Sequence, residues 1–95
     1  MKNGNVVGEL RAMELIDTIG MMTSEDYKER FKAEVCQLDI RMGKLAHMLS
    51  AWEAGELDFQ PACSFELLEA QLNGMKIYRH FLGVRAEIEG IKLYY

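Results

Sequence analysis

Apolar residues in the middle of the chain recur at the spacing of a helix that buries one face. From residue 25 to residue 54 they follow steps of four and three and form one line, called here the seam: Tyr27, Phe31, Val35, Leu38, Met42, Leu45, Leu49 and Trp52. Thr23 or Ser24 can cap the helix start, where acidic residues also favour the helix dipole. Gly55 is a natural stop. The pattern predicts a helix over residues 25–54.

A second amphipathic segment follows a short connection. Pro61 prevents helix continuation in residues 55–64, Ser64 can cap the next helix, and Gly90 can end it. The segment over residues 65–89 has its own seam: Leu68, Leu72, Met75, Leu82 and Ala86. Two long helices joined by a loop of this length predict an antiparallel αα-hairpin.

The N-terminal part of the chain carries a weaker helical pattern. Apolar residues spaced three apart predict a short helix over residues 9–20, with Gly20 as its end. Residues 1–8, with two glycines and two asparagines, predict a flexible arm. The 95 residues are too few for a second core, so we expect residues 1–95 to form a single all-α domain, a short helix followed by the hairpin.

Each long helix also carries a second apolar stripe, almost opposite its seam. The stripe on the first helix, called here the small stripe, consists mostly of small side chains: Ala33, Cys36, Ile40, Gly43, His47, Ala51 and Ala54. The stripe on the second helix, called here the large stripe, consists of large side chains: Ile77, Phe81, Val84, Ile88 and Ile91. A two-helix hairpin cannot bury both. We therefore expect a homo-oligomeric helical bundle in which small and large stripes of different chains pack together. The alternative is a three-helix monomer whose N-terminal helix covers part of one stripe.

Composition narrows the class of protein. Hydrophobic residues make up 49% and charged residues 27%, which indicates a folded chain. The chain has a formal charge of −4, whereas general DNA- or RNA-binding proteins carry an excess of basic residues. No apolar run approaches the about 18–20 residues of a membrane span, and no signal peptide precedes the helices. We expect a cytoplasmic protein with no nucleic-acid or membrane partner.

The residues that most often carry catalysis or bind metals are isolated in this sequence. Cys36, Cys63, His47 and His80 show no metal-ligand spacing, and two lone cysteines suit a reducing compartment. We find no nucleophile–base pattern and no phosphate-binding loop. The sequence predicts a protein that is not an enzyme, with no catalytic residue, no metal and no cofactor.

Arginines and tyrosines form one group of candidate ligand-binding residues. Arg30 and Arg41 fall on one flank of the first seam, Tyr78 and Arg85 on the matching flank of the second, and Arg79 points close to the second seam. Guanidinium groups suit phosphates, and a tyrosine, here Tyr78 or Tyr27, can stack on a base. The alternative is a solvated flank whose arginines pair with Glu34 and Glu89.

Four stretches resemble a known family. They are the segment MTSEDYKERFKAEVCQL from Met22, the segment LLEAQLNGMKIY from Leu67, the Trp-Glu-Ala-Gly turn at residues 52–55, and the ending RAEIEGI at residues 85–91. Over residues 22–91 the sequence resembles small helical-hairpin proteins of bacteriophages and prophages, including relatives in crAss-like phages. Chains of that family usually begin near Met22, so the resemblance implies that the N-terminal helix is an extension.

The resemblance implies a phage protein, and its architecture is similar to that of phage sponges for cyclic-nucleotide immune signals. We therefore expect a homo-oligomeric anti-defence protein in the host cytoplasm. It would bind a small nucleotide ligand, a cyclic oligonucleotide or an ADP-ribose derivative, without cleaving it. One alternative is a protein that inhibits a host defence effector such as a CRISPR nuclease, using the eight acidic residues between positions 25 and 58. Another is a structural or regulatory phage protein.

Overall fold

A computed structural model describes residues 13–93, and within that range every regular element is helical. A 3₁₀-helix, η1 (Leu15–Thr18), leads into the α-helical turn α2 (Ile19–Met22). Two long helices follow, α3 (Tyr27–Glu53) and α4 (Phe65–Glu89). The chain divides into two compact units, residues 1–40 and residues 41–95. The expected all-α fold class is therefore confirmed, whereas the oligomeric bundle stays a prediction.

The N-terminal helix differs from the expected range of 9–20. Residues 9–12 lie outside the described residues, residues 13–14 are not helical, and the helical run continues to Met22. The start is fixed at Leu15 because the Glu14 amide donates to the Asp17 carboxylate, at 2.9 Å. Gly20 does not end the run, since one interior glycine costs only about 1 kcal/mol. The end comes at Thr23, whose amide and hydroxyl both donate to the Ile19 carbonyl.

The start of α3 is also shifted, from the expected residue 25 to Tyr27. Asp26 acts as the cap, because its carboxylate accepts a hydrogen bond from the Lys28 amide at 2.9 Å. The Ser24 hydroxyl instead accepts from the Asp26 amide at 3.0 Å, so it stabilises the turn before the helix. The predicted cap at Thr23 or Ser24 was therefore wrong by two or three residues.

Two glycines end the long helices, as the sequence predicted. Gly55 and Gly90 have φ values of +73° and +69°, a left-handed conformation that costs glycine little. After α3, the Glu56 amide donates to the Ala51 carbonyl at 2.8 Å, and after α4 the Ile91 amide donates to Ala86 at 2.9 Å. Both are Schellman caps. At the other end of α4, the Ser64 hydroxyl accepts from the Leu67 amide at 3.1 Å.

The first unit packs the N-terminal turn against the early part of α3. The Gln37 amide on α3 bonds to the Thr18 hydroxyl on η1, and Thr18 is fully buried. Phe31, Val35 and Leu38 of the predicted seam are buried, whereas the ring of Tyr27, in the first turn of α3, is 46% exposed. The small stripe is also buried in this unit, at Ala33 and Cys36, so it does not lie open along its whole length.

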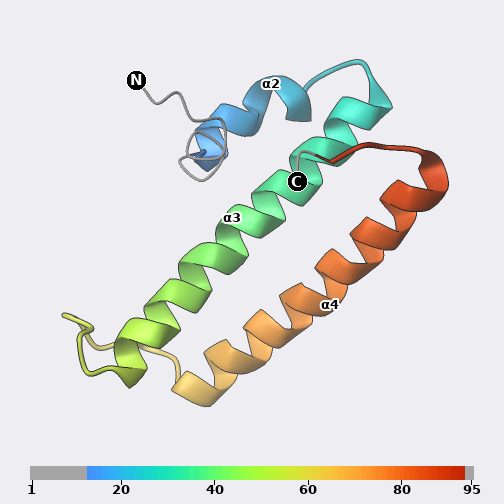
Figure 1. Cartoon of the computed structure of the whole chain (residues 1–95). Helices are drawn as coiled ribbons and strands as arrows, with labels where there is room; N and C mark the ends of the chain where they lie inside the picture. Colours follow the sequence, from blue (N-terminus) through green and yellow to red (C-terminus); the bar gives the residue numbers. More distant parts are fainter. Residues whose placement is uncertain (1–12, 94–95) are drawn as a thin grey trace, which may run out of the picture. The chain divides into compact units, whose positions relative to one another are not determined.

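In the second unit, the last part of α3 and α4 run in opposite directions on either side of the loop at residues 54–64 (Figure 1). The rings of Trp52 and Phe65 meet edge to face, 5.4 Å apart, where the loop joins them. The buried side chains of this unit are Leu49, Leu72, Leu82, Ala86 and Ile91. Ile91 was expected on the outward stripe, but the left-handed turn at Gly90 redirects the chain and Ile91 becomes buried.

Candidate functional site

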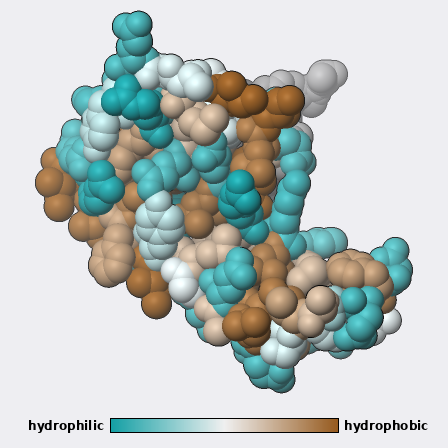
Figure 2. All heavy atoms as spheres, turned by 180° about the vertical axis from the view of Figure 1, so that it is seen from behind, coloured by the Kyte–Doolittle hydropathy of each residue, from teal (hydrophilic) through white to brown (hydrophobic). Residues whose placement is uncertain are grey.

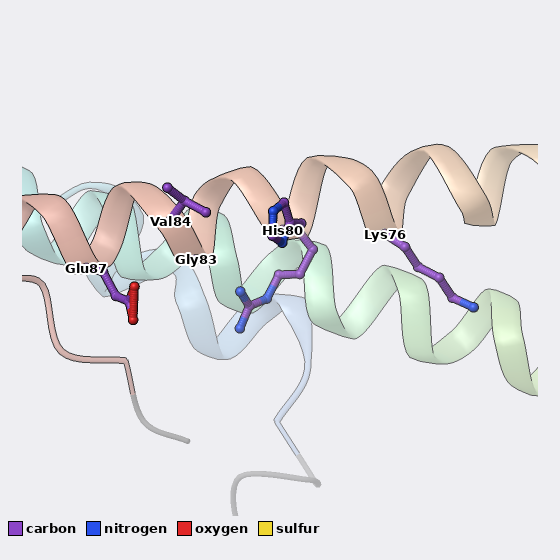
Figure 3. Close-up of a pocket in the computed structure, with 6 residues that line it drawn as sticks. Lys76, His80, Gly83, Val84 and Glu87 are labelled. Carbon is purple, nitrogen blue, oxygen red and sulfur yellow. The ribbon is translucent and has the colours of Figure 1, made fainter.

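One side of α4 forms a shallow groove of about 460 Å³ (Figure 3). Its lining residues follow helical spacing along three turns, and we call this set the α4 groove: Lys76, Arg79, His80, Gly83, Val84 and Glu87. Figure 3 shows Lys76 and Glu87 extending to the same side of the helix, with Val84 directed away from them. The whole groove therefore comes from a single helix of the second unit.

The α4 groove combines positive charge with open space. Lys76 and Arg79 carry the positive charges, and Glu87 carries the one negative charge of the groove, one turn beyond Gly83. A Cβ atom at position 83 would lie 3.4 Å from Nη1 of Arg79, so the guanidinium lies close to Gly83. A guanidinium offers paired donors that match the oxygen spacing of a phosphate or carboxylate. The chemistry of the groove suits an anion.

One aromatic ring, that of His80, lines the groove beside the cationic groups. The ring of His80 lies 5.8 Å from the ring of Phe81, at an angle of 57°. Phe81 is 58% exposed although it is a large apolar side chain. Aromatic faces next to cationic donors are the combination that binds a planar base beside its phosphate.

The structure places the predicted candidates of α4 on two different sides of that helix. Arg79 is half-buried and lines the groove. Tyr78, the residue before it, points about 100° away, and Arg85 is two turns further along on the side of Tyr78. Arg85 donates to the Glu89 carboxylate at 3.4 Å, which is the pairing that the sequence offered as the alternative to ligand binding.

The remaining candidates belong to α3. Tyr27 and Arg30 lie in the first unit, where the Arg30 guanidinium donates to the Ser24 carbonyl at 2.8 Å and the Tyr27 ring lies 6.3 Å from Phe31. Arg41 is exposed at the start of the second unit. A single site that includes all six predicted residues stays a prediction.

Sequence reasoning missed most of the α4 groove. Lys76, His80, Gly83, Val84 and Glu87 were not among the candidate ligand-binding residues, and His80 was considered only as a metal ligand. The sequence does contain a pattern that indicates the groove. Arg79, His80 and Gly83 follow Lys76 by three, four and seven positions, which places all four residues on one side of a helix. The sequence analysis instead grouped arginines with tyrosines, which favoured the flank of α4 that carries Tyr78 and Arg85.

The two cysteines are free, and they differ in environment. Cys36 is buried and Cys63 is exposed. Burial raises the pKa of the Cys36 thiol above its usual value of 9.0, and the carboxylates of Asp39 and Asp17 raise it further. The Cys36 thiol is therefore protonated at neutral pH and is a poor nucleophile. Among the described residues, no three His, Cys, Asp or Glu side chains gather as metal ligands would.

Comparisons with known proteins add one positive result. No curated protein and no solved structure gives a significant match. Within residues 13–93, none of the helices has the length and apolar character that crossing a membrane requires. The model of one protein family, described as Sequestin, matches residues 25–88, which include all of α3 and nearly all of α4. The family's name is consistent with sequestering a ligand and suggests a binding, non-catalytic role. Because the match extends over well more than half of its 95 residues, the chain belongs to the Sequestin family.

Proposed function

We propose that this protein is a phage anti-defence protein that sequesters a host nucleotide immune signal without cleaving it. The signal is a cyclic oligonucleotide or an ADP-ribose derivative, and the protein acts in the host cytoplasm. The observation that carries the proposal is the α4 groove, in which Arg79 and Lys76 lie beside the ring of His80. The family name supports the same direction.

Phosphate recognition in this proposal rests on Arg79. Arg79 is a half-buried residue, so a charge-assisted hydrogen bond there is screened less by water than one on an open surface. Lys76 lies one turn earlier on the same side of α4 and adds a second positive charge for a second phosphate. The net charge of −4 does not prevent this, because a local positive potential can differ in sign from the total.

Base recognition rests on the ring of His80, which lines the groove. His80 offers a planar ring, and stacking of one base on an aromatic ring is worth about 1–3 kcal/mol. Together with Arg79 and Lys76, this ring binds the two parts of a nucleotide, whereas an inorganic anion would use only the arginine and lysine.

Sequestration needs affinity and abundance rather than catalysis. A sponge lowers the free concentration of its ligand in proportion to the sites available, provided that the dissociation constant lies below the signalling concentration. The α4 groove contains no nucleophile beside a general base, which hydrolysis of a phosphodiester would require. We therefore expect the bound nucleotide to be released intact when the protein is denatured.

The test is calorimetry of the purified full-length protein against cyclic dinucleotides, cyclic trinucleotides and ADP-ribose derivatives, followed by chromatography of the released ligand. We expect one nucleotide class to bind, Arg79→Ala to weaken it by at least about tenfold, and Arg85→Ala to leave it nearly unchanged. The opposite ranking would move the site to the flank of Tyr78 and contradict the groove. Absence of binding to the whole panel, or recovery of a cleaved product, would overturn the proposed function.

A further inference from the structure

The outward face of α4 is strongly apolar and exposed. Four large side chains, called here the outer stripe, lie opposite the buried Leu72, Leu82 and Ala86: Ile77 (59% exposed), Phe81 (58%), Val84 (41%) and Ile88 (79%). Figure 2 shows hydrophobic side chains, in brown, among hydrophilic ones on one face of the molecule. Monomeric proteins rarely expose a continuous apolar patch of this kind without using it.

The outer stripe has a symmetric order along the helix. Its residues are spaced by four, three and four positions, so the pattern is the same in both chain directions. If a second α4 packs against it in the antiparallel direction, Ile77 comes level with Ile88 of the second copy, and Phe81 with Val84. Both pairs share one midpoint, between Leu82 and Gly83. A two-fold axis through that midpoint therefore brings all four residues of the outer stripe into contact with the outer stripe of the second copy.

The charges beside the outer stripe agree with this direction. Lys76 and Glu87 lie on the same side of α4, toward opposite ends of the stripe (Figure 3). In the antiparallel arrangement each Lys76 comes within one helical turn of Glu87 in the other copy, so two pairs of opposite charge form. A parallel two-fold pair would place Lys76 and Glu87 of the two copies on opposite flanks of the interface, so these pairs of opposite charge would not form.

We propose that the outer stripe of α4 is a two-fold interface between copies of this chain, with the two α4 helices antiparallel. The occupant is a second copy because both the apolar spacing and the charges are self-complementary, as an isologous contact requires. Sequence reasoning expected the large stripe to meet the small stripe of another chain, and this inference pairs the large stripe with itself. The interface shares Lys76, Val84 and Glu87 with the α4 groove and leaves Arg79 and His80 outside the pairing. Sedimentation without ligand therefore tests it separately from nucleotide binding.

The first test compares two phenylalanines of nearly equal exposure. Phe81 lies in the outer stripe, and Phe59, 56% exposed, lies in the loop at residues 54–64. We expect sedimentation of the full-length protein without ligand to show a dimer or an even-numbered oligomer at micromolar concentration. Phe81→Asp should weaken association by about 100-fold or more, because the two-fold axis doubles each change, while Phe59→Asp should have little effect. A monomeric wild type, or association that survives Phe81→Asp, would overturn the interface.

The second test fixes the direction of the helices. Lys76→Glu and Glu87→Lys should each weaken association at low salt, since each places like charges together across the axis. The double variant restores opposite charges and should recover most of the wild-type association. Circular dichroism of each variant confirms that the helices are intact. If the double variant associates no better than the single ones, the antiparallel pairing is wrong.

Discussion

The side-chain amide of Gln37 donates a hydrogen bond to the hydroxyl of Thr18, and the two atoms are 2.8 Å apart. Thr18 is fully buried, and its hydroxyl donates a hydrogen bond to the Leu15 carbonyl at 2.7 Å. This bond joins residues 19 positions apart and ties the N-terminal turn to α3. It explains how a helical run of only eight residues is held in place, since such a run is too short to be stable alone.

Replacement of Gln37 by alanine should therefore loosen the N-terminal turn. The Thr18 oxygen would keep a buried acceptor without its partner, at a cost of about 1–2 kcal/mol. We expect urea denaturation to show this loss, and hydrogen exchange to rise mainly at residues 15–22. Gln60→Ala, a change at an exposed loop position, is the matched control and should alter stability by less than about 0.5 kcal/mol. Equal effects of the two variants would contradict the role given to Gln37.

The glycines of α4 should respond in opposite directions to alanine. Gly90 has φ of +69°, where a Cβ atom is strained, so Gly90→Ala should lower the free energy of unfolding by about 1 kcal/mol. Gly74 lies inside α4, and a Cβ there meets nothing within 4 Å, so Gly74→Ala should raise it by about 0.5–1 kcal/mol. Thermal and urea denaturation measure both. Stabilisation by Gly90→Ala would show that this residue does not form the helix cap.

The two thiols should differ in reactivity. A thiol reagent at pH 8 should modify the exposed Cys63 at least about tenfold faster than the buried Cys36. The comparison uses Cys36→Ala and Cys63→Ala, each of which leaves one thiol. If Cys36 reacts as fast as Cys63 in the folded protein, the described burial of the first unit is wrong.

The raised pKa of Cys36 also gives a stability prediction. The unfolded chain loses this thiol proton near pH 9.0, while the folded chain keeps it to higher pH. The folded state then holds more protons, so stability falls as pH rises through that value. Cys36→Ala should therefore reduce the decrease in the free energy of unfolding between pH 7 and pH 10. Urea denaturation at the two pH values measures this. An unchanged pH dependence in the variant would contradict it.

The α4 groove should be blocked by a side chain at position 83. A Cβ added there would lie 3.4 Å from the Arg79 guanidinium, so the larger side chain of Gly83→Val would occupy the groove where the nucleotide is proposed to bind. We expect at least about a tenfold loss of nucleotide affinity in calorimetry. Gly74→Val carries the same cost in helix propensity but lies outside the groove, so it should bind nearly as the wild type does. Similar affinity in both variants would contradict the groove.

The ends of the long helices were predictable where a single residue type dominates. Ser64, Gly55 and Gly90 have no local competitor, and the structure uses each as the sequence predicted. The start of α3 was not predictable to the residue, because Thr23, Ser24 and Asp26 can all cap a helix. The choice among them depends on the turn before α3, where the Arg30 guanidinium also bonds to the Ser24 carbonyl.

The candidate site was harder to predict than the fold. Residue spacing indicates which side chains share a face of one helix, and it correctly placed Tyr78 with Arg85. It does not indicate whether an arginine is already engaged, as Arg85 is with Glu89. It also gives no weight to Gly83, whose contribution is the space that its missing side chain leaves beside Arg79.

The boundary between the two compact units, after Ile40, falls in the middle of α3 rather than in a linker. Proteases cut extended, exposed backbone, and a continuous helix offers none at that point. Limited digestion should therefore leave the two units joined and nick the chain first within residues 54–64, which are mostly exposed. The fragments obtained would each contain one long helix, so neither compact unit can be isolated by digestion.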